Sequence, residues 1–212
     1  MARKFRYRAG MGLRDDKKRA TRAALSWAAI RLTVARGADN VLVEDIAAAA
    51  GVSPRTFNNY FSSKGEAIAS RHLDRCLQMA EDLRNRPASE PLWDAIRQAA
   101  LNQVRPGPEV TAHPVPDRDT WVAGIRAMVG TPSLQAEMMR AAAVAEESLA
   151  AAVAERTGTD ADTDLYPRLV ASAVMGATNV ATAHWLRRGA TADVAELLTE
   201  ALTRVSAGLP PP

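Results

Sequence analysis

The sequence lacks the features that secreted, membrane-spanning and disulfide-stabilised proteins need. It has one cysteine, Cys76, so no disulfide can form within the chain. This is typical of a protein of the reducing cytoplasm. No run of 18 apolar residues occurs, so we expect no membrane span. The N-terminus is basic but leads into no apolar segment, so we do not interpret it as a signal peptide.

Catalytic groups are also scarce. The three histidines, His72, His113 and His184, are scattered without the spacing of metal ligands, and no glycine-rich phosphate-binding motif occurs. Cys76 follows His72 by four residues, which is the closest approach to a nucleophile–base pair, but two chance neighbours on a helix are the better interpretation. We therefore expect no enzyme, no metal and no cofactor.

Composition and charge indicate instead a helical protein with one basic part. Apolar residues make up 47% of the 212, aromatic residues only 5%, and alanine is frequent, which favours close-packed helices in one large or two small domains. Residues 1–75 carry 15 Lys and Arg against 7 Asp and Glu, whereas residues 76–212 carry 12 against 17. The positive charge expected of a phosphate-binding surface is therefore confined to the N-terminal third.

That third contains a pattern typical of two short helices joined by a tight turn, within residues 43–64. Ile46, Ala47 and Ala50 share one helical face, and Gly51 can end the helix with a positive φ. Ser53 is a good N-cap, and Pro54 suits the first position of the second helix.

The second short helix has two different faces. Phe57 and Phe61 are four residues apart and should point inward, which turns Arg55, Asn58, Asn59 and Tyr60 outward. Arginine can bond guanine O6 and N7, and asparagine can bond adenine N6 and N7, when such a helix lies in a DNA major groove. We expect base contacts from Arg55 and Asn58, with Asn59 as a further candidate. A helical hairpin from an unrelated bundle is the alternative, but it would not need this outward row.

At these residues the chain resembles the TetR family of bacterial transcriptional repressors. The matching positions are Ile46-Ala47, Ala50-Gly51-Val52-Ser53, Thr56-Phe57, Tyr60-Phe61 and Ser63-Lys64. The resemblance implies a three-helix DNA-binding head, here residues 1–64, and a helical regulatory and dimerisation body, residues 65–212. It also implies that Lys64 binds a phosphate, and we expect the same of Thr56 and Tyr60.

One position of the head departs from the family pattern. Many members carry threonine where this chain has Leu42, and that threonine caps the second helix and touches a phosphate. Leucine can do neither, so Leu42 is expected to pack with Val41 and Val43. The N-terminal residues Met1–Leu13 look flexible, and they are either a disordered tail or a basic arm that follows DNA phosphates.

Hydrophobic periodicity and breakers predict about nine helices and no strand. Ser63 and Glu66 form a capping-box pattern at the start of the fourth. The expected helices are residues 14–36, two between 43 and 61, then 64–84, 92–104, 117–128, 132–156, 167–188 and one capped by Thr191 that ends near Val205. Residues 105–116 contain four prolines and are expected to form a loop.

The body has two expected roles. Its last two helices carry apolar stripes that either close the monomer core or form a homodimer interface, and we favour the homodimer because one recognition helix reads too few base pairs. The family resemblance implies a pocket for a small-molecule effector. The candidate lining residues, for each of which ordinary core packing is an alternative, are Trp93, Trp121, Met128, Met138, Met175 and Asn179.

Within the family the head looks like an actinobacterial subgroup that includes the mycofactocin-system regulator, whose members respond to long-chain acyl-CoA. An acyl-CoA-like effector is therefore one candidate. The resulting hypothesis is an all-α, cytoplasmic homodimer that represses transcription from double-stranded DNA and is released by a ligand. The alternative is a helical interaction module whose basic head binds an acidic protein without any preference among DNA sequences.

Overall fold

The chain is all-α, as the periodicity predicts. The computed structural model describes residues 5–105 and 117–210, and it describes side-chain surroundings from residue 15 onward except at residues 127 and 128. Within these residues there are nine α-helices, one 3-10 turn and no strand. The elements are α1 (Phe5–Arg36), η1 (Ala38–Asn40), α2 (Val43–Ala49), α3 (Pro54–Asn58), α4 (Lys64–Arg84), α5 (Leu92–Val104), α7 (Arg118–Val129), α8 (Pro132–Thr157), α9 (Leu165–Arg187) and α10 (Val194–Ser206).

Two expected helix starts are corrected. Helix α1 begins at Phe5 rather than at residue 14, so the expected flexible segment is helical from Phe5 onward, while residues 1–4 lie outside the described part. The segment contains no proline, and its two glycines cost only about 1 kcal/mol each relative to alanine. At α10 the cap is Asp193, whose Oδ1 accepts from the Ala195 N–H at 2.8 Å, whereas the hydroxyl of Thr191 donates to the Arg188 carbonyl.

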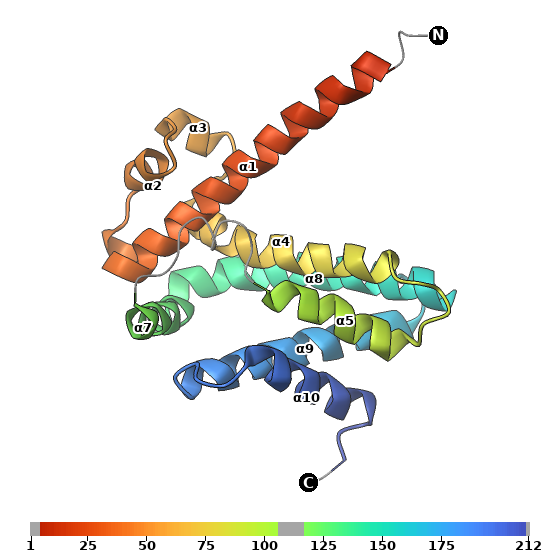
Figure 1. Cartoon of the computed structure of the whole chain (residues 1–212). Coiled ribbons are helices and arrows are strands. Elements are labelled where there is room, and N and C mark those ends of the chain that lie inside the picture. The colour runs from red at the N-terminus through yellow and green to blue at the C-terminus, as the bar shows by residue number, and fades with distance from the viewer. Residues whose placement is uncertain (1–4, 106–116, 211–212) are drawn as a thin grey trace.

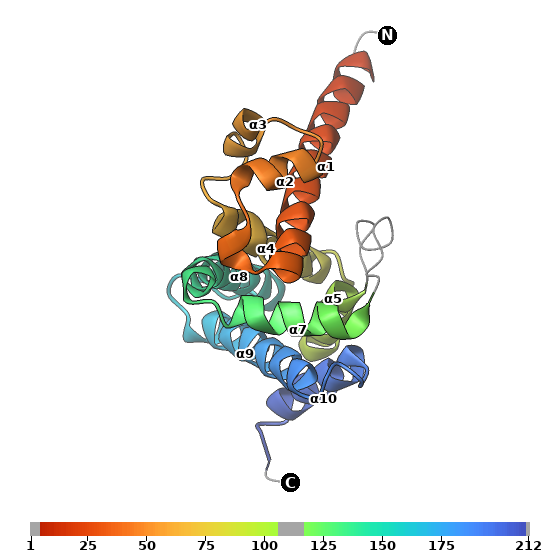
Figure 2. The same ribbon diagram turned by 90° about the vertical axis from the view of Figure 1, so that its left-hand side faces the viewer.

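The helices form two regions that α4 connects. Figure 1 shows α1, α2 and α3 on one side of the molecule and the α9–α10 pair on the opposite side, with α4, α5 and α8 between them. Helix α4 packs on α1 at its start and along α8 for most of its length. In the turned view of Figure 2, α7 lies between α1 and α9, and it packs against α1.

Each region has its own hydrophobic core. The first core contains Leu25, Ile46, Phe57 and Phe61, all at most 2% exposed, and it reaches Leu134 of α8. The second core joins α4, α5, α8, α9 and α10, and many of its members are alanines, which let the helices approach closely. A short α3 is therefore held on a rigid base and presented at one end of the molecule.

Candidate nucleic-acid interface

The turn between α2 and α3 follows the predicted local chemistry. Gly51 has φ +69°, a conformation that side chains with a Cβ rarely adopt. The Val52 N–H then donates to the Ala47 carbonyl at 2.9 Å, which closes the end of α2. Ser53 caps α3 by accepting from the Thr56 N–H at 3.1 Å, and Pro54 is its first residue. The predicted helix–turn–helix is therefore present.

The inward face of α3 fixes this short helix to α1. Phe57 and Phe61 are buried, with ring centroids 5.7 Å apart. The guanidinium of Arg22, on α1, lies 4.6 Å above the Phe61 ring and donates to the Tyr60 carbonyl at 3.5 Å. A helix of five residues has little stability of its own, so these contacts determine its orientation.

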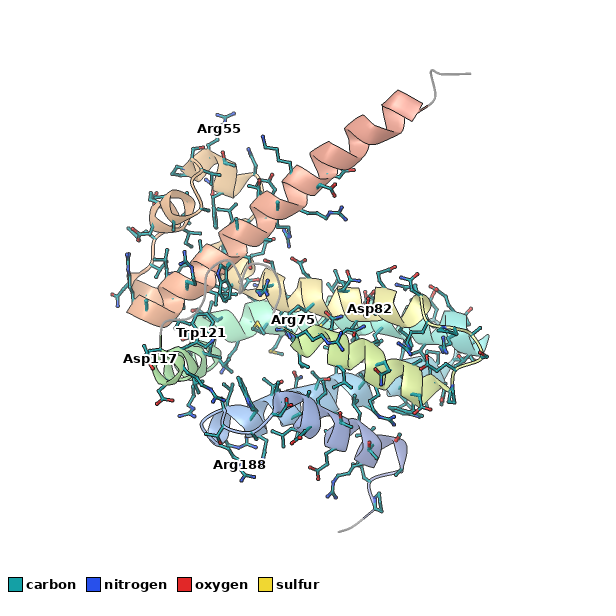
Figure 3. The ribbon with its side chains drawn as sticks, viewed as in Figure 1. Arg55, Arg75, Asp82, Asp117, Trp121 and Arg188 are labelled. Carbon is teal, nitrogen blue, oxygen red and sulfur yellow. The ribbon has the colours of Figure 1, made fainter. Side chains whose placement is uncertain are left out.

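The outward face of α3 carries the predicted base-reading side chains. Arg55, Asn58 and Asn59 are exposed, and none of their side chains forms a hydrogen bond with another described residue. Figure 3 shows Arg55 pointing away from the rest of the molecule at the far end of α3. The guanidinium of Arg55 and the amides of Asn58 and Asn59 therefore project from α3 with hydrogen-bond donors that no described residue uses.

The predicted phosphate-contacting residues have differing surroundings. Thr56 and Tyr60 are half-buried, and the Thr56 hydroxyl lies 2.9 Å from the Ser53 hydroxyl. Lys64 is already engaged, because its ammonium donates to the carbonyls of Ala38 and Val41 at 2.5 and 3.0 Å. Lys64 therefore ties the start of α4 to the η1 turn, a structural role that the sequence did not indicate.

The expectation for Leu42 is corrected. Val41 is fully buried, but Leu42 is 61% exposed, because the residue at an N-cap is extended and successive side chains point to opposite sides. Asp45 makes the reciprocal half of a capping box, since its Oδ2 accepts from the Leu42 N–H at 3.0 Å, while the leucine side chain accepts nothing from the first turn. An acidic residue three positions after a non-capping residue was the available signal.

The cap of α4 is present in a modified form. The Ser63 hydroxyl accepts from the Glu66 N–H at 3.0 Å, as predicted. The carboxylate of Glu66, however, accepts from the backbone and hydroxyl of Ser62, both at 2.7 Å, rather than from the Ser63 backbone.

The candidate pocket residues whose surroundings the structure describes lie in different parts of the molecule. Trp93 and Met175 belong to the second core, whereas Trp121 lies against the first core with its ring centroid 5.4 Å from that of Trp27. Asn179 is exposed on α9. The remaining two are Met138, half-buried on α8, and Met128, whose side chain lies outside the described residues.

His72 and Cys76 lie close together, but their surroundings do not favour a reactive thiolate. Their Nε2 and Sγ atoms are 3.7 Å apart. Burial raises the pKa of the Cys76 thiol to about 11, and burial followed by the charge of Arg75 lowers the pKa of His72. The thiol is thus protonated at neutral pH.

Among the described residues, no three His, Cys, Asp or Glu side chains gather as a metal site. No described helix is long and apolar enough to cross a membrane.

One face of α9 is apolar and uncovered in the single chain. Leu165, Leu169 and Val180 are 70%, 55% and 64% exposed. Beside this face a groove of 530 Å³ runs between α9 and α10, lined by Val180 and Leu197 among others. One side of α9, with Val170 and Val174, therefore packs inside the monomer, whereas the side with Leu165, Leu169 and Val180 does not.

Known proteins match both regions of the chain. Residues 27–69 match the family of bacterial regulatory proteins, tetR family, and residues 90–210 match the MftR C-terminal domain family. The transcriptional regulator TcmR of Streptomyces glaucescens is 34% identical over 187 residues, which are 86% of this chain and 80% of that protein. A Mycobacterium tuberculosis protein described as the mycofactocin biosynthesis regulator MftR is 34% identical over 84% of this chain and 83% of its own length.

A solved structure gives the same fold. It is the Thermus thermophilus FadR repressor in complex with lauroyl-CoA, which aligns with a TM-score of 0.51 and 19% identity over 90% of this chain and 96% of that one. The matches to the head and to the body, together with the two relatives, show that this chain belongs to the TetR family and is a DNA-binding transcriptional regulator.

Proposed function

We propose that the protein is a ligand-responsive repressor that binds a palindromic operator as a homodimer. The observation that carries this proposal is the outward row of α3. Arg55, Asn58 and Asn59 are exposed, have unused donors and stand on a helix whose inner face is locked by two buried phenylalanines. Because direct readout requires donors at fixed positions, this arrangement suits base recognition better than a general acidic surface.

The contacts divide into two kinds. Arg55 and Asn58 read base edges, with Asn59 beside them, whereas Thr56, Tyr60 and Lys64 lie nearer the groove wall and contact phosphates. Two of the three N–H donors of Lys64 hold backbone carbonyls, which leaves one for a phosphate oxygen. The head is residues 1–64, and the body that positions it is residues 65–212.

The apolar face of α9 and the adjoining α10 supports the homodimer. A second copy that covered Leu165, Leu169 and Val180 would remove a contiguous apolar surface from water, and a stable dimer needs such a surface. Val180→Arg should therefore convert a dimer into a monomer in sedimentation velocity. Met139→Arg is the matched control, because Met139 is 73% exposed on α8, outside this face. A wild-type monomer, or equal behaviour of the two variants, would count against this interface.

The effector enters the body near Trp93 and Met175, where α5, α8 and α9 share the second core. An apolar or acyl-type ligand is favoured, and the FadR relative crystallised with lauroyl-CoA is in agreement with it. Because Met175 is buried among packed side chains, the ligand must open this core. A ligand that prefers the opened body would change the spacing of the two heads and shift the population away from DNA.

The first experiment is selection of bound sequences from a random DNA pool at fixed, near-physiological salt. An enriched inverted repeat is the expected result, since each half would report one α3. Binding that is salt-sensitive but indifferent to sequence would remove the proposal and favour the helical interaction module instead.

Variants then separate base readout from charge. Arg55→Ala should weaken binding to the selected site by about 5- to 150-fold, the equivalent of about 1–3 kcal/mol, and should relax preference at one base pair. Arg188→Ala removes the same charge from an exposed position at the opposite end of the molecule (Figure 3) and should change little. Equal losses on selected and scrambled DNA for Arg55→Ala would refute the base contact.

A further inference from the structure

A cavity of 590 Å³ lies where α1, α4 and the end of α5 meet. Its volume is in the range of small-molecule sites, about 300–1,000 Å³. None of the six residues proposed to contact DNA lines it, and neither does any of the six candidate effector residues. The cavity is therefore separate from the DNA contacts and from the effector residues proposed above.

The lining of the cavity is strongly basic. Among the described residues, the lining contains two acids, Asp74 and Glu81, and five arginines, Arg19, Arg22, Arg71, Arg75 and Arg105. Glu81 is already paired with Arg84 at 2.5 Å, outside the lining, so its charge neutralises little inside. The separation between Arg22 Nε and Asp74 Oδ2 is 3.7 Å, which is too long for a hydrogen bond. Arg19 likewise pairs with Asp16, outside the lining, and the Arg71 guanidinium lies 5.4 Å from the centre of the Trp27 ring. The guanidinium groups of Arg75 and Arg105 therefore dominate the charge that the described lining presents to the cavity.

Two of these arginines have free donors. Arg75 and Arg105 form no hydrogen bond or ion pair with any residue in the described part of the chain. Desolvation by the surrounding protein, and then the like charge of Arg71, lower the pKa of the Arg75 guanidinium. Like charges crowded in this way are stabilised by an anion between them.

A buried hydroxyl also lacks a partner in this cavity. Ser26 lines it and is 2% exposed, yet its Oγ has no hydrogen-bond partner among the described residues. A serine within a helix can donate to the carbonyl four residues earlier, but this one does not. A buried polar atom without a partner destabilises the folded state, and a ligand oxygen at this position would supply the missing hydrogen bond.

Three amide side chains also line the cavity. Gln78, Asn102 and Gln103 line the cavity, and all three donate to the carboxylate of Asp82 at 2.9, 3.2 and 2.9 Å. Figure 3 shows Asp82 farther along α4 than Arg75. Asp82 therefore fixes the end of α5 against α4 and holds these amides in place. The wall suits a ligand with a polar body in addition to its charge.

We propose that this cavity binds a phosphate-bearing small molecule of about mononucleotide size. Guanidinium groups bind phosphate oxygens with paired, charge-assisted hydrogen bonds, and Arg75 and Arg105 have donors available for this. Ser26 donates to a further oxygen, and the amides of Gln78, Asn102 and Gln103 contact the uncharged part.

Arg22 connects this site to the DNA head. Its guanidinium supports the Tyr60 carbonyl and the Phe61 ring on one side and lines the cavity on the other. A bound phosphate competes with these contacts for Arg22 and so loosens the base of α3. The consequence is weaker DNA binding when the cavity is occupied. This consequence rests on the proposed DNA-binding function, whereas the binding of the anion itself does not.

The test is isothermal titration calorimetry of the full chain without DNA, at ionic strength held constant with sodium chloride. The probes are pyrophosphate, ADP and adenosine. Pyrophosphate and ADP should bind and adenosine should not. Arg75→Gln should weaken ADP binding at least 10-fold and Ser26→Ala several-fold. Both variants should fold, since neither the Arg75 guanidinium nor the Ser26 hydroxyl has a hydrogen-bond partner in the described part of the chain.

Two controls locate the site. Arg188→Gln removes an equal charge elsewhere, and Arg55→Ala removes a charge from the DNA-reading face, so both should bind ADP as the wild type does. Unchanged affinity in Arg75→Gln, an equal loss in Arg188→Gln, loss of binding in Arg55→Ala, or equal binding of adenosine and ADP would each overturn the proposal. If no operator emerges from the DNA pool, these titrations still decide the anion site. If one does, ADP should weaken operator binding by the wild type but not by Arg75→Gln.

Discussion

A glycine lies where α7 packs closely on α1, and its replacement tests this packing. Gly124 of α7 faces Val34 of α1. A Cβ built on Gly124 would lie 2.4 Å from Val34 Cγ1 and 2.8 Å from the Val34 carbonyl oxygen. The side-chain methyl could rotate away, but the backbone oxygen cannot. Gly124→Ala must therefore push α7 away from α1.

Two opposing effects set the magnitude. Alanine is favoured over glycine within a helix by about 1 kcal/mol, whereas overpacking costs about 1–3 kcal/mol. Because the rigid carbonyl places this site at the upper end of that range, the expected net loss is about 2 kcal/mol. For a chain of this size each kcal/mol corresponds to about 2–4 °C, so the midpoint of thermal unfolding should fall by about 4–8 °C.

The assay is thermal unfolding followed by circular dichroism at one protein concentration. Ala123→Gly is the matched control, because Ala123 is exposed one position earlier in α7 and reports helix propensity alone. It should cost about 1 kcal/mol. If Gly124→Ala raised the midpoint by about the amount that Ala123→Gly lowers it, the contact between α7 and α1 would be refuted.

Two further predictions concern buried and tethered groups. The pKa of Cys76 is raised from 9.0 to about 11, so the folded state holds its proton more tightly. About 3 kcal/mol of stability that is present below pH 9 should therefore be lost as the pH rises through 11. Urea unfolding at pH 8 and at pH 10.5 should show a larger loss for the wild type than for Cys76→Ala; equal losses would contradict the burial of the thiol. Lys64→Met removes both hydrogen bonds to the loop before α2 and should cost about 1.5–3 kcal/mol in urea unfolding, whereas Lys18→Met, at an exposed and unpaired position, should stay within about 0.5 kcal/mol. Similar values for the two lysine variants would show that the tether contributes nothing.

The DNA head could be predicted closely because its signals are local. Gly51 and Ser53 act on the backbone within a few residues of themselves, and Phe57 and Phe61 define an inward face by their spacing alone. Arg55 and Asn58 are then outward by geometry. The prediction for Leu42 was wrong. Leu42 was expected to pack beside Val41, but its backbone is extended, so its side chain points to the opposite side from that of Val41 and is exposed.

Features that join distant segments were not predictable in this way. The tether from Lys64 to the carbonyls of Ala38 and Val41 spans more than 20 residues, and no spacing rule selects one lysine for it. Spacing along the chain also could not show that two of the candidate pocket residues, Trp121 and Met175, lie in different cores.

The sequence by itself determined the helical class, most helix ends and the outward row of α3, because periodicity, caps and breakers act over one or two turns. Only the tertiary structure decided which helices meet. It placed Arg22 of α1, Arg75 of α4 and Arg105 after α5 around one cavity, and it left the hydroxyl of Ser26 buried there without a partner among the described residues. Such a cluster depends on how whole helices cross, and crossing is set by the summed packing of many side chains rather than by any local pattern.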